Sequence, residues 1–181
     1  MALTQTSFRV RNDDGNETTA TWVQATNTNA SLNVDTTYRL RHLISEDGDF
    51  SALDDRFQYN LAAAGWVNIT TTSSVVKAVA SANVTDDGAT TEQLAGAGSF
   101  IAGKITEDGL CASTSLSPGE DLEDELVFQI VSGDVTNGQT LQIRSTAAGS
   151  ALAAYTNTVT ITVVEAAATS TPTRMTMGVG T

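Results

Sequence analysis

Apolar and polar residues alternate with a period of two over much of the chain. The alternation is clearest in residues 37–44 and 156–163, and it recurs in residues 125–131 and 140–144. Successive side chains of a strand point to opposite faces of its sheet, so this spacing predicts half-buried β-strands. Weaker examples of the same pattern are residues 7–11, 19–24, 57–61, 66–70, 75–80 and 100–105.

The alternation also predicts which side chains face the core. On the strand of residues 37–44, His42 shares the apolar face with its alternate neighbours, while Arg39 and Arg41 lie on the other face. We expect the following residues to be buried: Leu40, Ile44, Phe128, Ile130, Ile143 and Ile161.

Turn residues separate the predicted strands at short intervals. Gly follows Asp at residues 15, 48, 88 and 109, and such pairs favour chain reversals because both residues tolerate the left-handed region of backbone space. Helical patterning is nearly absent, and only residues 51–56 are expected to form one short helical turn. About ten strands at this spacing predict an all-β fold, a single antiparallel β-sandwich of the jelly-roll or immunoglobulin-like kind, over residues 1–165.

Residues 166–181 fall outside the strand pattern and are expected to form an extended C-terminal arm. In an extended conformation Met175, Met177 and Val179 share one face. We predict that these three side chains contact another subunit, with the arm added as a strand to a neighbouring sheet. The alternative is that the arm packs against its own sandwich.

The charge of the chain limits its partners. Nine Lys and Arg residues stand against 21 Asp and Glu residues, which gives a formal net charge of −12. Such a surface repels phosphate backbones and anionic headgroups, so neither nucleic acid nor a membrane is an expected partner. The N-terminus has no basic start followed by an apolar run, so no signal peptide is expected.

Few residues are available for catalysis. One Cys, Cys111, excludes an internal disulfide, and one His, His42, excludes a metal centre built from several histidines. No nucleophile motif or phosphate-binding loop is present. We predict core packing for His42, a small buried thiol for Cys111, and no enzymatic activity, catalytic residue or cofactor.

Acidic residues gather in several places. Glu46, Asp47, Asp49, Asp54 and Asp55 suggest a calcium site, but their spacing does not match a calcium-binding loop. Solvated turns are therefore favoured, and no metal site is predicted. The acidic run of residues 120–125 is expected to form a wet loop before the next strand.

Two tryptophans, Trp22 and Trp66, allow two interpretations. Each lies in a strand-like segment, which favours core packing, and the alternative is a platform on which a sugar stacks.

The order of segments and turns resembles β-sandwich modules of tailed-bacteriophage virion proteins. The resemblance covers most of residues 4–164 and concerns rhythm and turn placement. The segments that carry it are residues 9–15, 20–22, 38–41, 65–70, 75–81, 90–94 and 98–104.

The resemblance implies a structural protein without cofactor or chemistry. The leading expectation is a capsid decoration (cement) protein that binds the head exterior as a homo-oligomer and contacts the major capsid protein or other virion proteins. Its location would be the virion, after synthesis in the host cytoplasm. The alternatives are a phage tail component (tube, collar or fibre base) and a carbohydrate-binding adhesin module.

Overall fold

The computed structural model describes residues 3–48 and 51–165, and these form an all-β structure without a helix. None of this part of the chain therefore supplies a helix of the length and apolarity that crossing a membrane requires. The predicted contact residues Met175, Met177 and Val179 lie outside the described residues. The strands are β1 Leu3–Asn12, β2 Ala30–Asn33, β3 Tyr38–Glu46, β4 Ser51–Leu53, β5 Gln58–Leu61, β6 Val67–Asn68, β7 Val76–Ala78, β8 Ser99–Thr106, β9 Thr114–Leu116, β10 Glu120–Ile130, β11 Thr140–Arg144, β12 Thr146–Ala147, β13 Ser150–Ala151, β14 Ala154–Tyr155 and β15 Val159–Val164.

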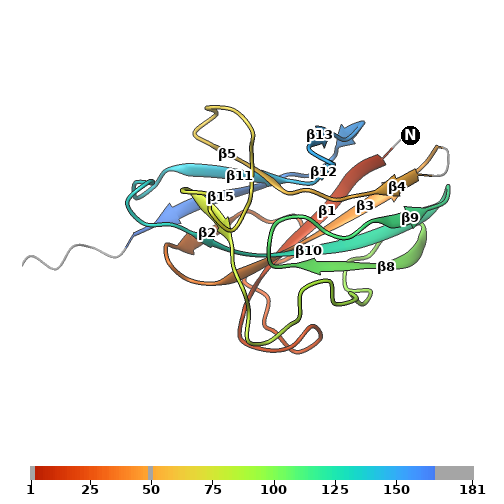
Figure 1. Ribbon diagram of the computed structural model, residues 1–181, viewed down its shortest axis with the longest axis horizontal. Coiled ribbons are helices and arrows are strands. Elements are labelled where there is room, and N and C mark those ends of the chain that lie inside the picture. Colours follow the sequence, from red (N-terminus) through yellow and green to blue (C-terminus); the bar gives the residue numbers. More distant parts are fainter. Residues whose placement is uncertain (1–2, 49–50, 166–181) are drawn as a thin grey trace, which may run out of the picture.

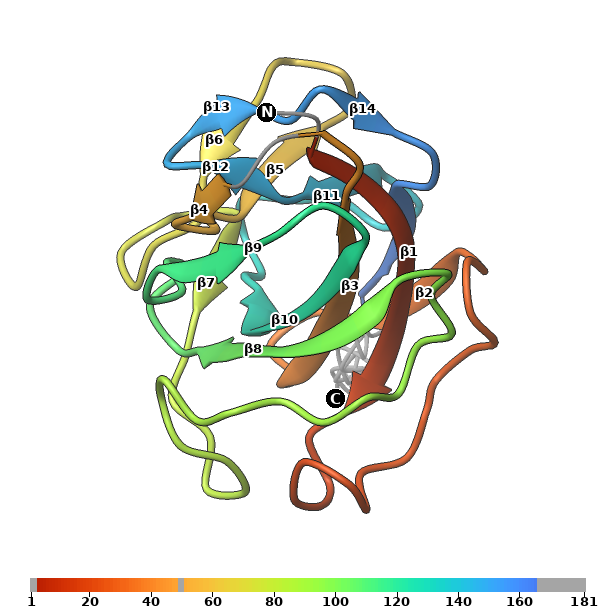
Figure 2. The ribbon, with the colours of Figure 1, turned by 90° about the vertical axis from the view of Figure 1, so that its right-hand side faces the viewer.

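Two main sheets pack face to face (Figure 1). The six-stranded sheet has the order β14-β1-β3-β10-β7, with β8 also paired to β10, and the five-stranded sheet has the order β2-β15-β11-β5-β6. The pairs β4–β9 and β12–β13 form two small additional sheets. Seen in Figure 2, β5 and β11 lie on the opposite side of the sandwich from β8 and β10.

Most strand pairs are antiparallel, as the predicted sandwich requires. In the centre of the larger sheet, Leu40 of β3 lies opposite Val10 of β1 and Leu126 of β10. Three pairs are parallel instead, and they join β14 to β1, β8 to β10 and β2 to β15. The predicted fold class is confirmed, with parallel strands added to a mainly antiparallel arrangement.

The predicted core residues are all buried. Leu40, Ile44, Phe128, Ile130, Ile143 and Ile161 are each 0 % exposed. The faces of the strongest strands were therefore predicted correctly from the alternation.

Two local predictions were wrong. Residues 51–56 do not form a helical turn, because β4 occupies residues 51–53 and Leu53 packs into a buried apolar cluster. Residues 19–24 form no strand and contribute only a single bridge, between Trp22 and Arg11. In both cases tertiary packing decided a short segment whose own preference is weak.

Gly109 shows why an Asp-Gly pair is needed at one of the turns. Its φ is +90°, and an added Cβ would lie 2.2 Å from the carbonyl oxygen of Ile69. A side chain at this position meets both backbone strain and a steric clash.

Candidate functional site

A layer of buried polar side chains crosses the interior of the sandwich. On β3, Leu40 belongs to the larger hydrophobic cluster and Ile44 to the smaller one, and His42 lies between them. Asp124 of β10 is directly opposite His42. We call the following residues, each at most 1 % exposed, the polar layer: Gln5, His42, Asp55, Asp124, Ser145 and Thr146.

Hydrogen bonds join the polar layer across the two sheets. The Ser145 hydroxyl donates to Asp55 Oδ2 over 2.9 Å, and His42 Nδ1 lies 2.7 Å from the same hydroxyl oxygen. Nδ1 of the neutral His42 forms this hydrogen bond with Ser145 in either ring tautomer. The backbone N–H groups of Ser145 and Thr146 donate to Gln5 Oε1 (2.9 Å) and Asp55 Oδ1 (3.2 Å).

Burial changes the protonation of this layer. It raises the pKa of Asp124 to about 7, although the Lys104 N–H donates to Asp124 Oδ1 over 2.6 Å. Burial, and then the charge of Asp124, raise the pKa of Asp55 well above its usual range. Burial lowers the pKa of His42 to about 3. The histidine is therefore neutral, and the two carboxyl groups retain protons that exposed aspartates release.

The presence of Ser, His and Asp side chains in one chain of hydrogen bonds does not make a nucleophile here. In an activated Ser–His–Asp set the aspartate accepts from the histidine, whereas Asp55 here accepts from Ser145. All three side chains are also 0 % exposed. The polar layer therefore lies entirely within the packed interior of the sandwich.

A second set of buried charges lies on the opposite face of the larger sheet. Arg39 and Arg41 lie there as predicted, but both are 0 % exposed. Glu125 is paired with Arg41 (2.7 Å), with Arg39 (3.3 Å) and with Arg11, whose Nε donates over 3.0 Å. We call the following residues the arginine–carboxylate cluster: Arg11, Arg39, Arg41, Asp13, Glu17, Glu123 and Glu125.

Two long connections cover this cluster. The connection from β1 to β2 accepts a hydrogen bond at Gly15 O from Arg39 Nη2 (2.7 Å). The connection from β7 to β8 accepts one at Thr91 O from Arg41 Nη1 (2.7 Å). Both connections lie below the larger sheet in Figure 1. The guanidinium groups therefore hold irregular segments against the sheet.

The carboxylates of the cluster favour the charged form of Arg41. Burial alone lowers the pKa of Arg41, but the carboxylates of Glu125, Glu17 and Glu123 outweigh it and raise that pKa. Arg39 also lies 3.3 Å from Asp13. Each buried cation thus has carboxylate partners, as its burial requires.

The acidic run of residues 120–125 was wrongly predicted to be a wet loop. It forms the first half of β10, and Asp121, Glu123 and Glu125 are buried. Glu123 Oε1 accepts the backbone N–H groups of Gln93 (2.9 Å) and Leu94 (2.8 Å). The run forms a strand because its buried charged residues have partners: Glu125 pairs with arginines of β1 and β3, and Glu123 accepts from the connection between β7 and β8.

The acidic residues considered for calcium binding are not brought together. Glu46 and Asp55 are buried, Asp54 lines a pocket, Asp47 is exposed, and Asp49 lies outside the described residues. These residues are close in sequence but lie in different parts of the fold, because Glu46 ends β3 whereas Asp55 follows β4 and belongs to the polar layer.

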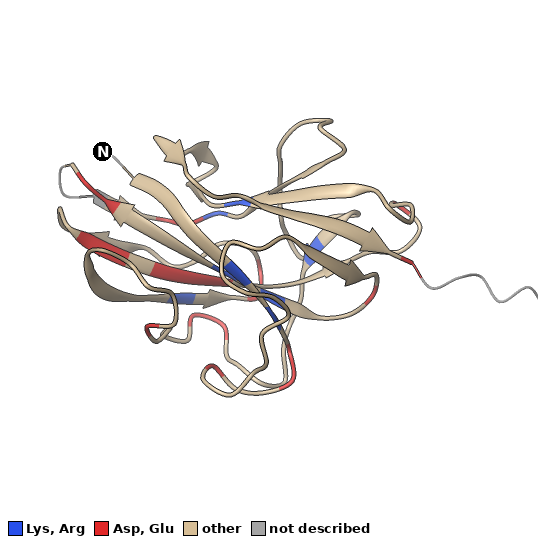
Figure 3. Ribbon diagram, turned by 180° about the vertical axis from the view of Figure 1, so that it is seen from behind, with Lys and Arg blue, Asp and Glu red and all other residues tan. Residues whose placement is uncertain are grey.

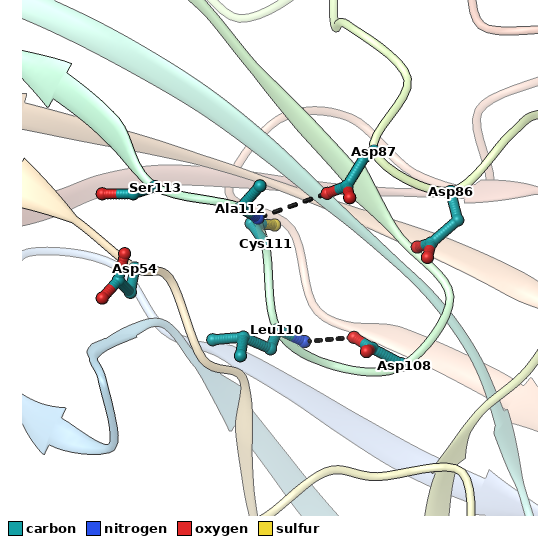
Figure 4. Close-up of a pocket in the computed structure, with 8 residues that line it drawn as sticks. All are labelled: Asp54, Asp86, Asp87, Asp108, Leu110, Cys111, Ala112 and Ser113. Atoms are coloured by element: carbon teal, nitrogen blue, oxygen red, sulfur yellow. Dashed lines mark hydrogen bonds between the residues drawn. The ribbon is translucent and has the colours of Figure 1, made fainter.

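Other aspartates do converge on a pocket of about 400 Å³ (Figure 4). Asp87 Oδ1 accepts the N–H of Ala112 (3.3 Å), and Asp108 Oδ1 accepts the N–H of Leu110 (2.9 Å). Within the described residues no three His, Cys, Asp or Glu side chains are arranged to hold a metal ion. The lining residues are Asp54, Asp86, Asp87, Asp108, Leu110, Cys111, Ala112 and Ser113.

The two main sheets differ sharply in charge. The strands of the six-stranded sheet contain twelve Lys, Arg, Asp or Glu residues, whereas those of the five-stranded sheet contain one, Arg144. Figure 3 shows this contrast, with red concentrated along β10 and the five-stranded sheet almost entirely tan. We call the outer surface of the five-stranded sheet the neutral face, defined by Ser31, Asn60, Thr140, Gln142, Thr160 and Thr162.

A groove of about 440 Å³ runs over the neutral face. The sequence did not single out this groove, because its residues are far apart in the chain and meet only through strand register. Gln142 of β11 lies opposite Asn60 of β5 on one side and Thr160 of β15 on the other. The groove is lined by Asn60, Ala62, Ala63, Thr140, Gln142 and Thr160.

The predicted environments of Cys111 and His42 are confirmed. Cys111 is 1 % exposed, and burial raises the pKa of its thiol well above the ordinary range. His42 lies 5.4 Å from the Phe57 ring centre within the sandwich.

The prediction that both tryptophans pack in the core was wrong. Trp22 and Trp66 are half-buried and lie outside the hydrophobic clusters. The guanidinium of Arg9 lies 4.3 Å from the Trp22 ring centre, and that of Arg144 lies 4.0 Å from the Trp66 ring centre. Each indole packs against a cation, whose attraction to the π-face favours this arrangement.

The fold defines the class of this protein as an all-β, two-sheet sandwich with a buried polar layer and an outer face on the five-stranded sheet whose described strands carry one charged residue, Arg144. Comparison with protein-family models, with curated proteins and with solved structures found no match.

Proposed function

We propose that this protein is a structural subunit of a tailed-phage virion, and specifically a capsid decoration protein that binds the head exterior. One observation supports the proposal: buried titratable side chains form hydrogen bonds and ion pairs that link the two sheets and the long connections. The arginine–carboxylate cluster binds both long connections to the sheet, and the polar layer joins the two sheets. A rigid sandwich built in this way suits a particle surface.

The charge of the chain supports docking onto a complementary surface. A net charge of −12 keeps free subunits apart in solution. A basic or neutral surface on the major capsid protein, or on another virion protein, would remove this repulsion when subunits dock. The same reasoning favours a homo-oligomer that forms around a capsid symmetry axis rather than in free solution.

Virion composition tests the proposal. Quantitative mass spectrometry of purified particles, with the major capsid protein as internal standard, is expected to find a high copy number, and a particle map is expected to place the subunit on the head exterior. Absence from the particles contradicts the proposal. A few copies located at the tail would favour the runner-up, a tube, collar or fibre-base component.

Removal of residues 166–181 tests the predicted attachment. We expect the truncated protein to keep the melting temperature of the full chain and to lose capsid binding, measured by co-sedimentation with capsids. Substitution of Met175, Met177 and Val179 by Ser in the full-length chain is the matched variant. Equal binding by the truncated and full-length proteins would show that attachment uses the sandwich itself.

A further inference from the structure

We propose that the groove on the neutral face is a binding site for a neutral saccharide. This site is separate from the predicted capsid attachment, so either proposal stands if the other fails. Its volume of about 440 Å³ lies within the range of about 300–1,000 Å³ that is typical of small-molecule sites.

The floor of the groove offers unused hydrogen-bonding groups. The side chains of Thr140, Gln142 and Thr160 have no hydrogen-bond partner among the described residues. Asn60 Oδ1 accepts the N–H of Gly65 (3.0 Å), which leaves its amide group as a donor. Amides and hydroxyls that both donate and accept are the groups that pair with sugar hydroxyls.

One wall of the groove is a strained turn. Ala62 and Ala63 have φ values of 48° and 62°, and the Ala64 N–H donates to Leu61 O over 2.9 Å. Left-handed backbone is unfavourable for alanine, and such strain is characteristic of functional sites.

An aromatic and cationic group extends the same face. Arg144 Nη2 donates to Gln58 Oε1 (2.8 Å), and its guanidinium lies 4.0 Å from the Trp66 ring centre and 5.4 Å from the Tyr155 ring centre. Both rings are half-buried and therefore retain some accessible edge. Arg144 has no carboxylate partner in the described residues, so its remaining donors suit ligand hydroxyls.

The chemistry of the face favours a saccharide over a protein. Among the described residues Val67 is the exposed large hydrophobic side chain, at 49 %. The centre of a protein interface is apolar and rich in aromatic residues, whereas this groove is lined by amides, hydroxyls and methyl groups. The five described strands contain no carboxylate, and their one cation, Arg144, stacks on Trp66 and donates to Gln58. The groove itself is lined by uncharged groups, which matches an uncharged ligand.

Saturation-transfer NMR on the full chain tests the site. The probes are glucose, galactose, mannose, N-acetylglucosamine and their disaccharides, and the strongest binder is then titrated by calorimetry. We expect at least one probe to bind, and Gln142→Ala to weaken its affinity at least fivefold. Within the described part of the chain the Gln142 side chain has no hydrogen bond to lose, so this variant is expected to fold normally.

Two matched pairs separate the groove from the rest of the surface. Trp66→Ala, which removes the ring against Arg144, is also expected to weaken saccharide binding. Gln24→Ala is the control for Gln142→Ala. Trp22→Ala is the control for Trp66→Ala, since Trp22 also packs against arginine but lies in the connection from β1 to β2. We expect both controls to bind like the unaltered protein. Failure of every probe to bind, or equal affinity of Gln142→Ala, overturns the proposal. A dimer in sedimentation that Gln142→Lys dissociates, without saccharide binding, assigns the face to self-association and also overturns it.

Discussion

The two sheets of this sandwich use polar residues in opposite ways. In the five-stranded sheet, inward positions such as Leu141 and Ile143 are buried, while outward Thr140 and Gln142 meet solvent. In the six-stranded sheet, the outward Arg41 is as buried as its inward neighbour Leu40. Alternation of polarity therefore marks solvent exposure in one sheet and a second buried layer in the other.

The difference comes from the long connections. Each guanidinium of the arginine–carboxylate cluster has more donors than one carboxylate can use, and backbone carbonyls such as Gly15 O and Thr91 O take the remainder. The connections are therefore attached to the sheet by hydrogen bonds from buried guanidinium groups rather than by apolar contacts. The residues that define the neutral face carry no such groups, and each of them is partly or fully exposed.

Breaking the cluster is expected to give the largest effect. Glu125→Gln removes the charge that three guanidinium groups share, and we expect it to lower the free energy of unfolding by about 3–5 kcal/mol. Urea denaturation measures the change. Glu92→Gln, on the exposed part of the covering connection, is the control and is expected to change stability by less than about 0.5 kcal/mol. Similar values for the two variants would show that the cluster is not a structural anchor.

Phe128→Ala tests the inward side of the same strand. Phe128 is 0 % exposed and lies 6.3 Å from the Tyr38 ring centre, so its removal leaves a cavity between the sheets. We expect a loss of about 3–5 kcal/mol in the same measurement. A loss below about 1 kcal/mol would contradict the assignment of faces on β10.

The polar layer is expected to make stability depend on pH. Folded Asp124 keeps its proton up to a pKa of about 7, whereas the unfolded chain releases it near the ordinary value of 3.8. The contribution of this proton to the free energy of unfolding is therefore complete below pH 3.8, the ordinary pKa, and is lost as the pH rises through about 7. His42, with a pKa of about 3 when folded and 6.5 as its ordinary value, acts in the opposite direction.

Asp124→Asn separates the carboxyl pair of Asp124 and Asp55 from His42, because His42 is present in both proteins. We expect the free energy of unfolding of the unaltered protein, minus that of the variant, to fall by about 1 kcal/mol from about pH 6 to pH 8. Asp47→Asn, at an exposed position, controls for the loss of one negative charge. A difference that stays constant over this range would show that Asp124 is ionised throughout.

The smallest expected effect concerns the strained turn beside the neutral face. Replacing Ala62–Ala63 by Asn-Gly supplies residues that tolerate positive φ at both positions, and we expect a gain of about 1 kcal/mol in thermal or urea unfolding. A loss of stability would show that the alanine methyl groups contribute packing that outweighs the strain.

Much of the sandwich follows from local pattern. The burial of Leu40, Phe128 and Ile143 is predictable, because a period of two assigns each side chain to a face of its strand. The turn at Asp108–Gly109 is likewise predictable from the residue types, because the backbone conformation at Gly109 excludes a side chain.

The chemistry of each face was decided only by the tertiary structure. Glu125 belongs to a buried cluster because Arg11 and Arg41 reach it from other strands, more than eighty residues away in sequence. Gln142 forms a groove with Asn60 and Thr160 because the register of three strands aligns them. Residue type and spacing determine which way a side chain points within its strand, whereas the free energy of a polar group depends on what covers it, and long-range contacts set that cover.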